Sequence, residues 1–170
     1  TLLECKLQGI SSYGFEINPL LHFIGKVSIE MELDQKKLAE DFEKILLNFG
    51  KTKAKFLNTD VEEIGIAIPP IHNPFRWWRK DVLKDLLVLK KSINDLDSAK
   101  SYRDFFLLGL AGVLVPDLTN VTLGKLQLHF INRDQDEIDV IETFSKHIEK
   151  MIFDLNFVEK EKTNSAPTEL

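Results

Sequence analysis

The chain has 170 residues, of which 44% are hydrophobic, and a formal net charge of −5. Its length allows one globular domain with a sizeable core, and its single cysteine, Cys5, excludes an intrachain disulfide and a cysteine-based zinc site. The excess of acidic residues argues against indiscriminate binding to nucleic acid, and no apolar run approaches the ~18 residues that span a bilayer. We expect a reducing, cytoplasmic location and no membrane partner.

The first 32 residues predict a helix, a strand and a second helix. Residues 1–8 place leucines four positions apart, and Gly9 follows where a helix commonly ends. Apolar side chains alternate over residues 13–17, which is typical of a short strand, and the Asn-Pro pair that follows would end it. Residues 20–31 then carry apolar side chains at the spacing of an amphipathic helix.

The remaining pattern is mainly helical. Apolar side chains recur at helical spacing in four segments: 34–49, 81–94, 98–115 and 137–153. Gly50 and Pro116 are expected to end the first and third of these helices. Small residues in the third helix, Gly109, Ala111 and Gly112, predict that another helix approaches it closely.

Strands are expected at only two further places. Residues 64–68 could form one, although Pro69 and Pro70 would confine it to a sheet edge, and residues 123–131 alternate as a strand does. The segment 159–170 is charged, then small and polar, and predicts a linker. The pattern as a whole indicates an α/β fold that is rich in helix and has few strands.

Glu16 lies at the end of the strand predicted in the first helix–strand–helix unit. In doubly wound α/β folds, an acidic residue at this position accepts hydrogen bonds from the two hydroxyls of a ribose. The same position suits a solvent-facing glutamate that caps the helix after Asn18 and Pro19. Spacing leaves both interpretations open, because no glycine-rich loop precedes the unit in this chain.

Three blocks of the sequence resemble, in order, the DNA amino-methyltransferases, S-adenosylmethionine-dependent enzymes that modify N6 of adenine or N4 of cytosine. Residues 1–19 resemble the helix and strand after the family's Phe-x-Gly-x-Gly-Thr loop, where the strand ends in an acidic residue and Asn-Pro. Residues 73–83 look like the Trp-Phe-x-x-x-Val-Leu stretch of one subgroup, and residues 102–111 match its Arg-Asp-Phe-Phe helix. Thr119-Asn120 stands where that subgroup has Ser-Asn.

This resemblance implies an incomplete Rossmann-like methyltransferase unit with a large, mostly helical insertion. Residues 1–32 would be part of the cofactor-binding unit, residues 33–158 the insertion, and residues 159–170 a linker towards a catalytic segment. The chain would then be part of a site-specific enzyme that transfers a methyl group to an exocyclic base amine.

The resemblance also assigns the cofactor and its contacts. By likeness to the family, Glu16 would bind the ribose of S-adenosylmethionine and Ile17 would line the adenine pocket. Asn18 and Pro19 would fix the turn that presents both residues.

The chain lacks two motifs of the family, the glycine-rich loop and the catalytic Asp/Asn/Ser-Pro-Pro-aromatic motif. Its Pro69-Pro70 pair is flanked by Ile68 and Ile71. These supply neither an oxygen to accept hydrogen bonds from the target amine nor a ring to stack on a flipped base. We therefore assign no catalytic residue, and we expect an internal piece of a longer enzyme that is inactive by itself.

The segment from Arg76 to Lys80 interleaves cations with two tryptophans, a composition typical of a nucleic-acid contact. Arg76, Arg79 and Lys80 are the candidate phosphate contacts to double-stranded DNA. In the alternative interpretation, the tryptophans pack at a helix entrance and the cations around them are solvated. The resemblance to restriction-modification methyltransferases also admits a restriction endonuclease as a partner protein.

Two other functions stay open on the sequence. A non-catalytic helical module that binds DNA or protein would make Glu16 an ordinary strand-end acid, and a nicotinamide-dependent oxidoreductase would use it for a similar ribose contact. No metal site is expected, since the acidic run at 134–137 lacks the glycine and glutamate of a calcium loop and the four histidines are scattered.

Overall fold

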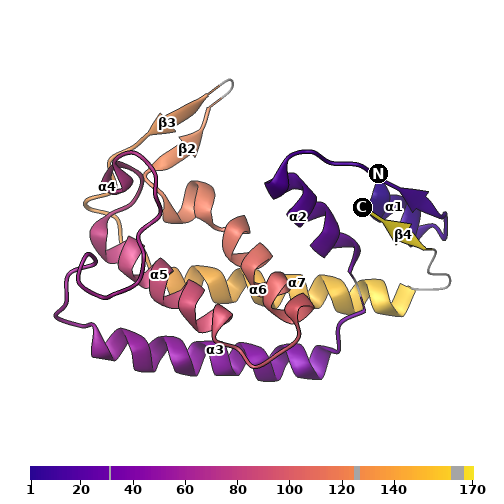
Figure 1. The fold of residues 1–170 in the computed structure, drawn as a ribbon, viewed down its shortest axis with the longest axis horizontal. Coiled ribbons are helices and arrows are strands. Elements are labelled where there is room, and N and C mark those ends of the chain that lie inside the picture. The colour runs from indigo at the N-terminus through magenta and orange to yellow at the C-terminus, as the bar shows by residue number, and fades with distance from the viewer. Residues whose placement is uncertain (31, 125–126, 162–166) are drawn as a thin grey trace.

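The computed structural model describes residues 1–30, 32–124, 127–161 and 167–170. The helices are α1 (Leu2–Leu7), α2 (Pro19–Ile29), α3 (Gln35–Lys55), α4 (Pro74–Trp77), α5 (Lys80–Asn94), α6 (Lys100–Gly112), the π-helical turn η1 (Leu114–Leu118) and α7 (Val140–Glu161). The strands are β1 (Ser12–Tyr13), β2 (Val121–Leu123), β3 (Leu128–Phe130) and β4 (Thr168–Glu169). The protein is thus helix-rich, and its described strands form two small sheets (Figure 1).

The core lies between α3, α5, α6 and α7 (Figure 1). Each of these helices buries one apolar stripe, as expected for amphipathic helices that pack around a common centre. The largest side chains that are almost completely buried here are Leu38, Ile45, Leu89, Ile93, Phe106, Phe144 and Ile148. None of the helices within the described ranges is long and apolar enough to cross a membrane.

The predicted close approach at the small residues of α6 is confirmed. A β-carbon at Gly109 would collide with Cδ1 of Ile148, and one at Gly112 would lie 2.7 Å from Nε2 of His147. Both contacts come from α7, so glycine lets the two helix backbones come together. Phe105, Phe106 and Leu110 on the same helix are buried, as their apolar pattern predicts.

Several predicted boundaries are wrong, each for a local physical reason. Gly50 does not end α3, which continues to Lys55 because Phe49 is buried and Lys53 pairs with Asp85 at 2.6 Å. This tertiary packing outweighs the cost of about 1 kcal/mol of a glycine within a helix. The third predicted helix ends at Gly112, and Val115 is extended because the proline after it disfavours helical backbone.

The two predicted strands also differ from the structure. Residues 64–68 form a bend followed by irregular chain rather than a strand, and Ile64 is buried against α5 instead. The segment 123–131 contributes β2 and β3, an antiparallel hairpin in which Val121 lies opposite Phe130. In the tail, α7 continues to Glu161, residues 162–166 lie outside the described part, and β4 follows.

A buried carboxylate links α3 to the start of α6. Asp41 is completely buried, and its Oδ1 accepts hydrogen bonds from Nζ of Lys37 at 2.8 Å and of Lys44 at 3.4 Å. Its Oδ2 accepts one from Oγ of Ser98 at 2.5 Å. Burial raises the pKa of the Asp41 carboxyl, but these three hydrogen bonds outweigh it, so the pKa lies below its ordinary value.

Replacing Phe106 by alanine should lower the free energy of unfolding by about 3 kcal/mol, because the substitution leaves a cavity at the centre of the core. Phe106 is completely buried and stacks on Phe42 with ring centroids 6.2 Å apart. Urea unfolding followed by circular dichroism measures the change. Phe153→Ala is the control, since that ring is 68% exposed and should contribute less than about 0.5 kcal/mol. Equal effects of the two substitutions would contradict this core.

Replacing Asp41 by asparagine should cost about 2 kcal/mol at pH 7, because hydrogen bonds to a charged acceptor are lost or weakened. A carboxyl whose pKa is lowered by folding stabilises the protein above its ordinary pKa of about 3.9, and this stabilisation disappears as pH falls through the lowered value. The difference between wild type and variant should therefore shrink in acid. Urea titrations at several pH values test this, with the exposed Glu43→Gln on the same helix as control.

Candidate functional site

In the N-terminal unit, β1 packs beside α1 and pairs with the last described strand. β1 pairs in parallel with β4, so that Ser12 lies opposite Thr168 and Tyr13 opposite Glu169. A β-carbon at Gly14 would lie 2.6 Å from Cδ1 of Leu2 in α1 and 2.9 Å from Cδ1 of Leu170. This glycine therefore lets the extended chain after β1 pack closely on the helical side.

The opposite side of the same segment is open and apolar. Side chains alternate along an extended chain, so Tyr13, Phe15 and Ile17 share the side that faces away from Gly14. All three are exposed, Phe15 and Ile17 almost completely. Leu20 and Leu21 at the start of α2 are also more than half exposed. Exposed apolar side chains grouped in this way are typical of a face against which another surface packs.

Glu16 lies where this extended segment turns into α2. Its Oε1 accepts a hydrogen bond from the backbone N–H of Asn18 at 2.8 Å, and its Oε2 accepts none from a described residue. The Asn18 side chain in turn caps α2, accepting from the backbone N–H groups of Leu20 and Leu21 at 2.9 and 3.3 Å. Pro19 is the first residue of the helix, a position that proline favours. The carboxylate is thus held by one oxygen, and its other oxygen makes no hydrogen bond to a described residue.

Two of the three cations predicted to contact DNA are bound within the protein. The guanidinium of Arg79 donates to both carboxylate oxygens of Asp81, at 3.1 and 2.5 Å, and to the backbone oxygens of Arg133 and Asp136 at 2.8 and 2.6 Å. The hydrogen bond from Arg79 lowers the pKa of Asp81. Lys80 donates to Oε1 of Glu62 at 2.9 Å and thereby lowers the pKa of that carboxyl.

Arg76 differs from them, because it is exposed and makes no ion pair with any described residue. Its guanidinium lies over the ring of Phe130, 3.9 Å from the centroid. Trp77 meets the same ring edge-on at 5.3 Å, and its backbone oxygen accepts from the N–H of Asn120 at 2.7 Å. Trp78 packs instead against both apolar clusters of the interior, as the alternative interpretation of the tryptophans expects.

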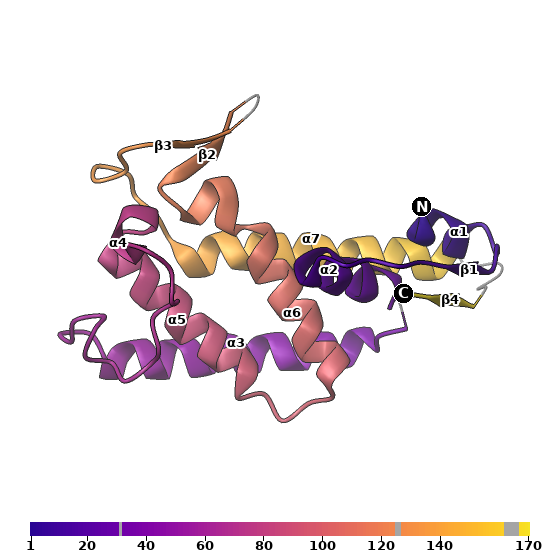
Figure 2. The same cartoon turned by 45° about the horizontal axis from the view of Figure 1, so that its top comes forward.

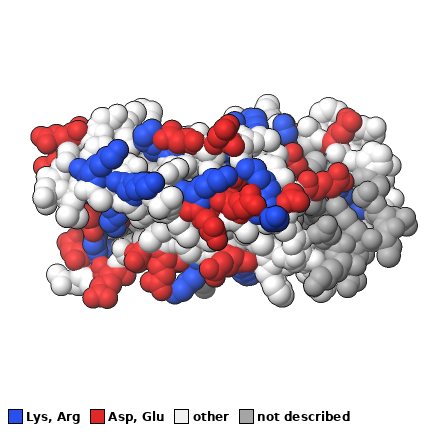
Figure 3. Space-filling model, turned by 90° about the horizontal axis from the view of Figure 1, so that it is seen from below, with Lys and Arg blue, Asp and Glu red and all other residues white. Residues whose placement is uncertain are grey.

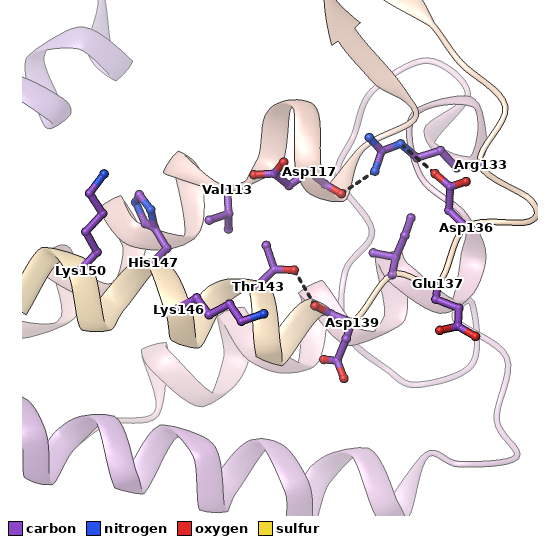
Figure 4. Close-up of a pocket in the computed structure, with 11 residues that line it drawn as sticks. Val113, Asp117, Arg133, Asp136, Glu137, Asp139, Thr143, Lys146, His147 and Lys150 are labelled. Atoms are coloured by element: carbon purple, nitrogen blue, oxygen red, sulfur yellow. Dashed lines mark hydrogen bonds and ion pairs between the residues drawn. The ribbon is translucent and has the colours of Figure 1, made fainter.

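An open pocket of about 700 Å³ lies between η1, the segment before α7 and α7 itself (Figure 4). Lys146, His147 and Lys150 approach it from α7, and Asp117 and Arg133 from the opposite wall (Figure 4). Arg133 is itself engaged, donating to the backbone oxygen of Asp117 at 2.6 Å. The wall thus mixes both signs of charge, and no group of three potential metal ligands occurs among the described residues.

No family model, curated protein or solved structure matches this chain. Its function must therefore be inferred from its own side chains and their arrangement.

The spacing of residues in the sequence could not identify the side chains that contact Arg76 and Lys80. Phe130 lies 54 positions after Arg76 in the sequence, and only folding brings the two together. Glu62 precedes Lys80 by 18 positions, across an irregular segment. A local signal did exist for Asp81, which follows Arg79 by two residues at the start of a helix, where an acid is favoured.

Replacing Arg79 by alanine should lower the free energy of unfolding by about 2 kcal/mol, because the side chain ties residues 133–136 to the start of α5 through charged hydrogen bonds. Urea unfolding tests this, with Arg76→Ala as the matched control. Arg76 is exposed and its removal should change stability by less than about 0.5 kcal/mol. If both variants lose equal stability, the distinction drawn between these two arginines is wrong.

Proposed function

We propose that this chain is part of an S-adenosylmethionine-dependent DNA methyltransferase that modifies an exocyclic base amine, and that residues 16–19 hold part of the cofactor site. A cytoplasmic location belongs to the same proposal. The observation that carries it is the position of Glu16, at the end of an extended segment that leaves a parallel strand pair and enters a helix.

The arrangement around β1 supports a Rossmann-like unit. Parallel strands need a crossover connection, and here that connection contains every element from α2 to α7. Helices α1 and α2 contact each other, and α1 also contacts β1 and β4. Parallel sheets in α/β proteins are covered on both faces. The exposed row of Tyr13, Phe15 and Ile17 is what such a sheet would present to a covering layer.

The residues present fit the ribose and adenine of the cofactor. Oε2 of Glu16 has no hydrogen bond to a described residue and can accept from a ribose hydroxyl. Ile17, next to it, offers an exposed apolar side chain to one face of an adenine ring and would exclude water there. The cap formed by Asn18 and the fixed φ of Pro19 hold the backbone between them in one conformation.

The chain's contribution in this proposal is binding and orientation. S-adenosylmethionine, when bound, supplies the methyl group. Glu16 fixes the ribose and so fixes the distance of the cofactor from the target base, and correct placement of reacting groups is a large part of enzymatic rate acceleration. We assign the reaction itself to no residue of this chain.

One observation favours a second function, a non-catalytic helical module that binds DNA or protein. Oε1 of Glu16 already accepts from the N–H of Asn18, so the carboxylate also has a structural role in positioning the residue that caps α2. A module of this kind would need Glu16 for stability alone. The two functions differ in what they expect from a conservative substitution.

Glu16→Gln should keep the cap, because an amide oxygen can accept from the N–H of Asn18, but should weaken binding of S-adenosylmethionine by the intact protein. Glu16→Ala should weaken it at least tenfold, equivalent to about 1.4 kcal/mol. Isothermal titration calorimetry measures the affinity, and thermal unfolding measures the cap.

Glu4→Ala is the matched control, since Glu4 is an exposed acid of the same unit and should leave the affinity unchanged. A Glu16→Ala variant that melts earlier but binds the cofactor as wild type does would assign Glu16 to capping. That result would favour the helical module.

A further inference from the structure

The β2–β3 hairpin and α4 form one projecting lobe. Figures 1 and 2 show the hairpin extending away from the helical body, with α4 beside its base. The backbone N–H of Asn120 donates to the oxygen of Trp77 at 2.7 Å, and the N–H of Ile131 donates to the oxygen of Asn120 at 3.0 Å. With the Trp77–Phe130 ring contact, these bonds fix the hairpin base to α4.

This lobe is built from two stretches of sequence that contain no acidic residue. Residues 64–80 and 118–133 lack Asp and Glu entirely, in a chain with 27 of them and a net charge of −5. The face of the molecule that carries α3 is different, because acidic and basic side chains alternate across it (Figure 3). Folding brings residues 71–78 of the first stretch beside Thr119, Asn120 and Phe130 of the second.

The faces of the hairpin also differ from each other. Val121, Leu123, Leu128 and Phe130 share one face, and Thr122 and His129 share the other. Beyond the buried Val121, the apolar face is open, with Leu123 69% and Leu128 46% exposed.

We propose that this lobe is the element that contacts double-stranded DNA, with the hairpin in the major groove and Arg76 on a phosphate at its edge. The inference rests on the proposed methyltransferase function. A major groove about 12 Å wide admits a two-stranded ribbon. Thr122 and His129, on the polar face of the hairpin, can hydrogen-bond to base edges.

Arg76 suits the role of a phosphate contact better than the two cations that follow it. Stacking on Phe130 orients its guanidinium but uses none of its N–H donors, so all five are available to an anion. Arg79 already donates hydrogen bonds to Asp81 and to two backbone oxygens. Of the cations predicted to contact DNA, Arg76 is therefore the one that we assign to a phosphate. The β2–β3 hairpin is the part that we assign to the groove.

The test is fluorescence anisotropy of labelled duplexes with the intact protein, over a range of salt concentrations. Arg76→Ala should weaken binding to every duplex by about five- to tenfold. It should also reduce the slope of log affinity against log salt by about 0.9, the contribution of one phosphate contact. Arg76→Lys keeps the charge, so it should preserve the slope while losing part of the affinity, because lysine lacks the planar fork.

The double variant Thr122→Ala/His129→Ala addresses the groove. It should reduce discrimination between duplex sequences and leave the salt slope unchanged, since base contacts carry specificity and phosphate contacts do not. Lys91→Ala is the matched control for charge. Lys91 is an exposed cation at the far end of α5, paired with Asp95 at 2.7 Å, and its loss changes net charge by the same amount as Arg76→Ala.

The proposal is overturned if the wild-type protein binds no duplex, if Arg76→Ala and Lys91→Ala act alike, or if the double variant leaves discrimination unchanged. A face that docks another copy of this protein is the competing outcome. The double variant Leu123→Ser/Leu128→Ser would then abolish self-association, measured by sedimentation, and would leave the affinity for DNA unchanged.

Calorimetry separates this inference from the cofactor site. Binding of S-adenosylmethionine that depends on Glu16, together with failure of the DNA results, would overturn the lobe alone, and the reverse pattern would overturn the cofactor site alone.

Discussion

At Gly109 and Gly112 the backbone of α6 lies against the side chains of Ile148 and His147 on α7, and a β-carbon at either position would force those side chains to move. The buried rings of Phe106 and Phe144 lie on these helices and share one core with residues of α3 and α5. Because protein interiors are close-packed, a shift between α6 and α7 would be felt by the whole core. The contact between α6 and α7 also positions the two candidate regions. The hairpin follows α6 through η1, and α2 of the N-terminal unit packs against α6.

The two ends of the molecule then present different chemistry. One end offers an apolar, partly covered strand pair with a carboxylate at its margin, and the other offers an acid-free lobe with one unpaired arginine. Between them lies a charged but balanced surface (Figure 3). Balanced charge is poor at attracting DNA, whereas a local excess of positive charge attracts it even on an acidic protein.

Local pattern predicted the helices well because each of them buries a stripe that repeats at helical spacing, as in the α5 segment from Val82 to Ile93. It failed where the outcome depends on distant partners. Gly50 looks like a stop until the contact of Lys53 with Asp85 is known. Residues 123–131 alternate as one strand would, and only the pairing of Leu123 with Leu128 shows that the chain folds back. For the site, the position of Glu16 was visible in sequence, but the cap it makes and the partners of Arg76, Arg79 and Lys80 were not.

The β1–β4 pair joins residues 12–13 to residues 168–169, so nearly every other element lies within the loop that this pairing closes. Closing a loop of that length lowers the entropy of the chain before any stabilising contact forms. The hydrogen bonds between two short strands do not offset this loss until the helices have packed. The pair is therefore expected to form late in folding and to open first. The exchange rate of the amide hydrogens of Ser12 and Gly14, which donate to Pro167 and Glu169, would report on the docking of the whole N-terminal unit.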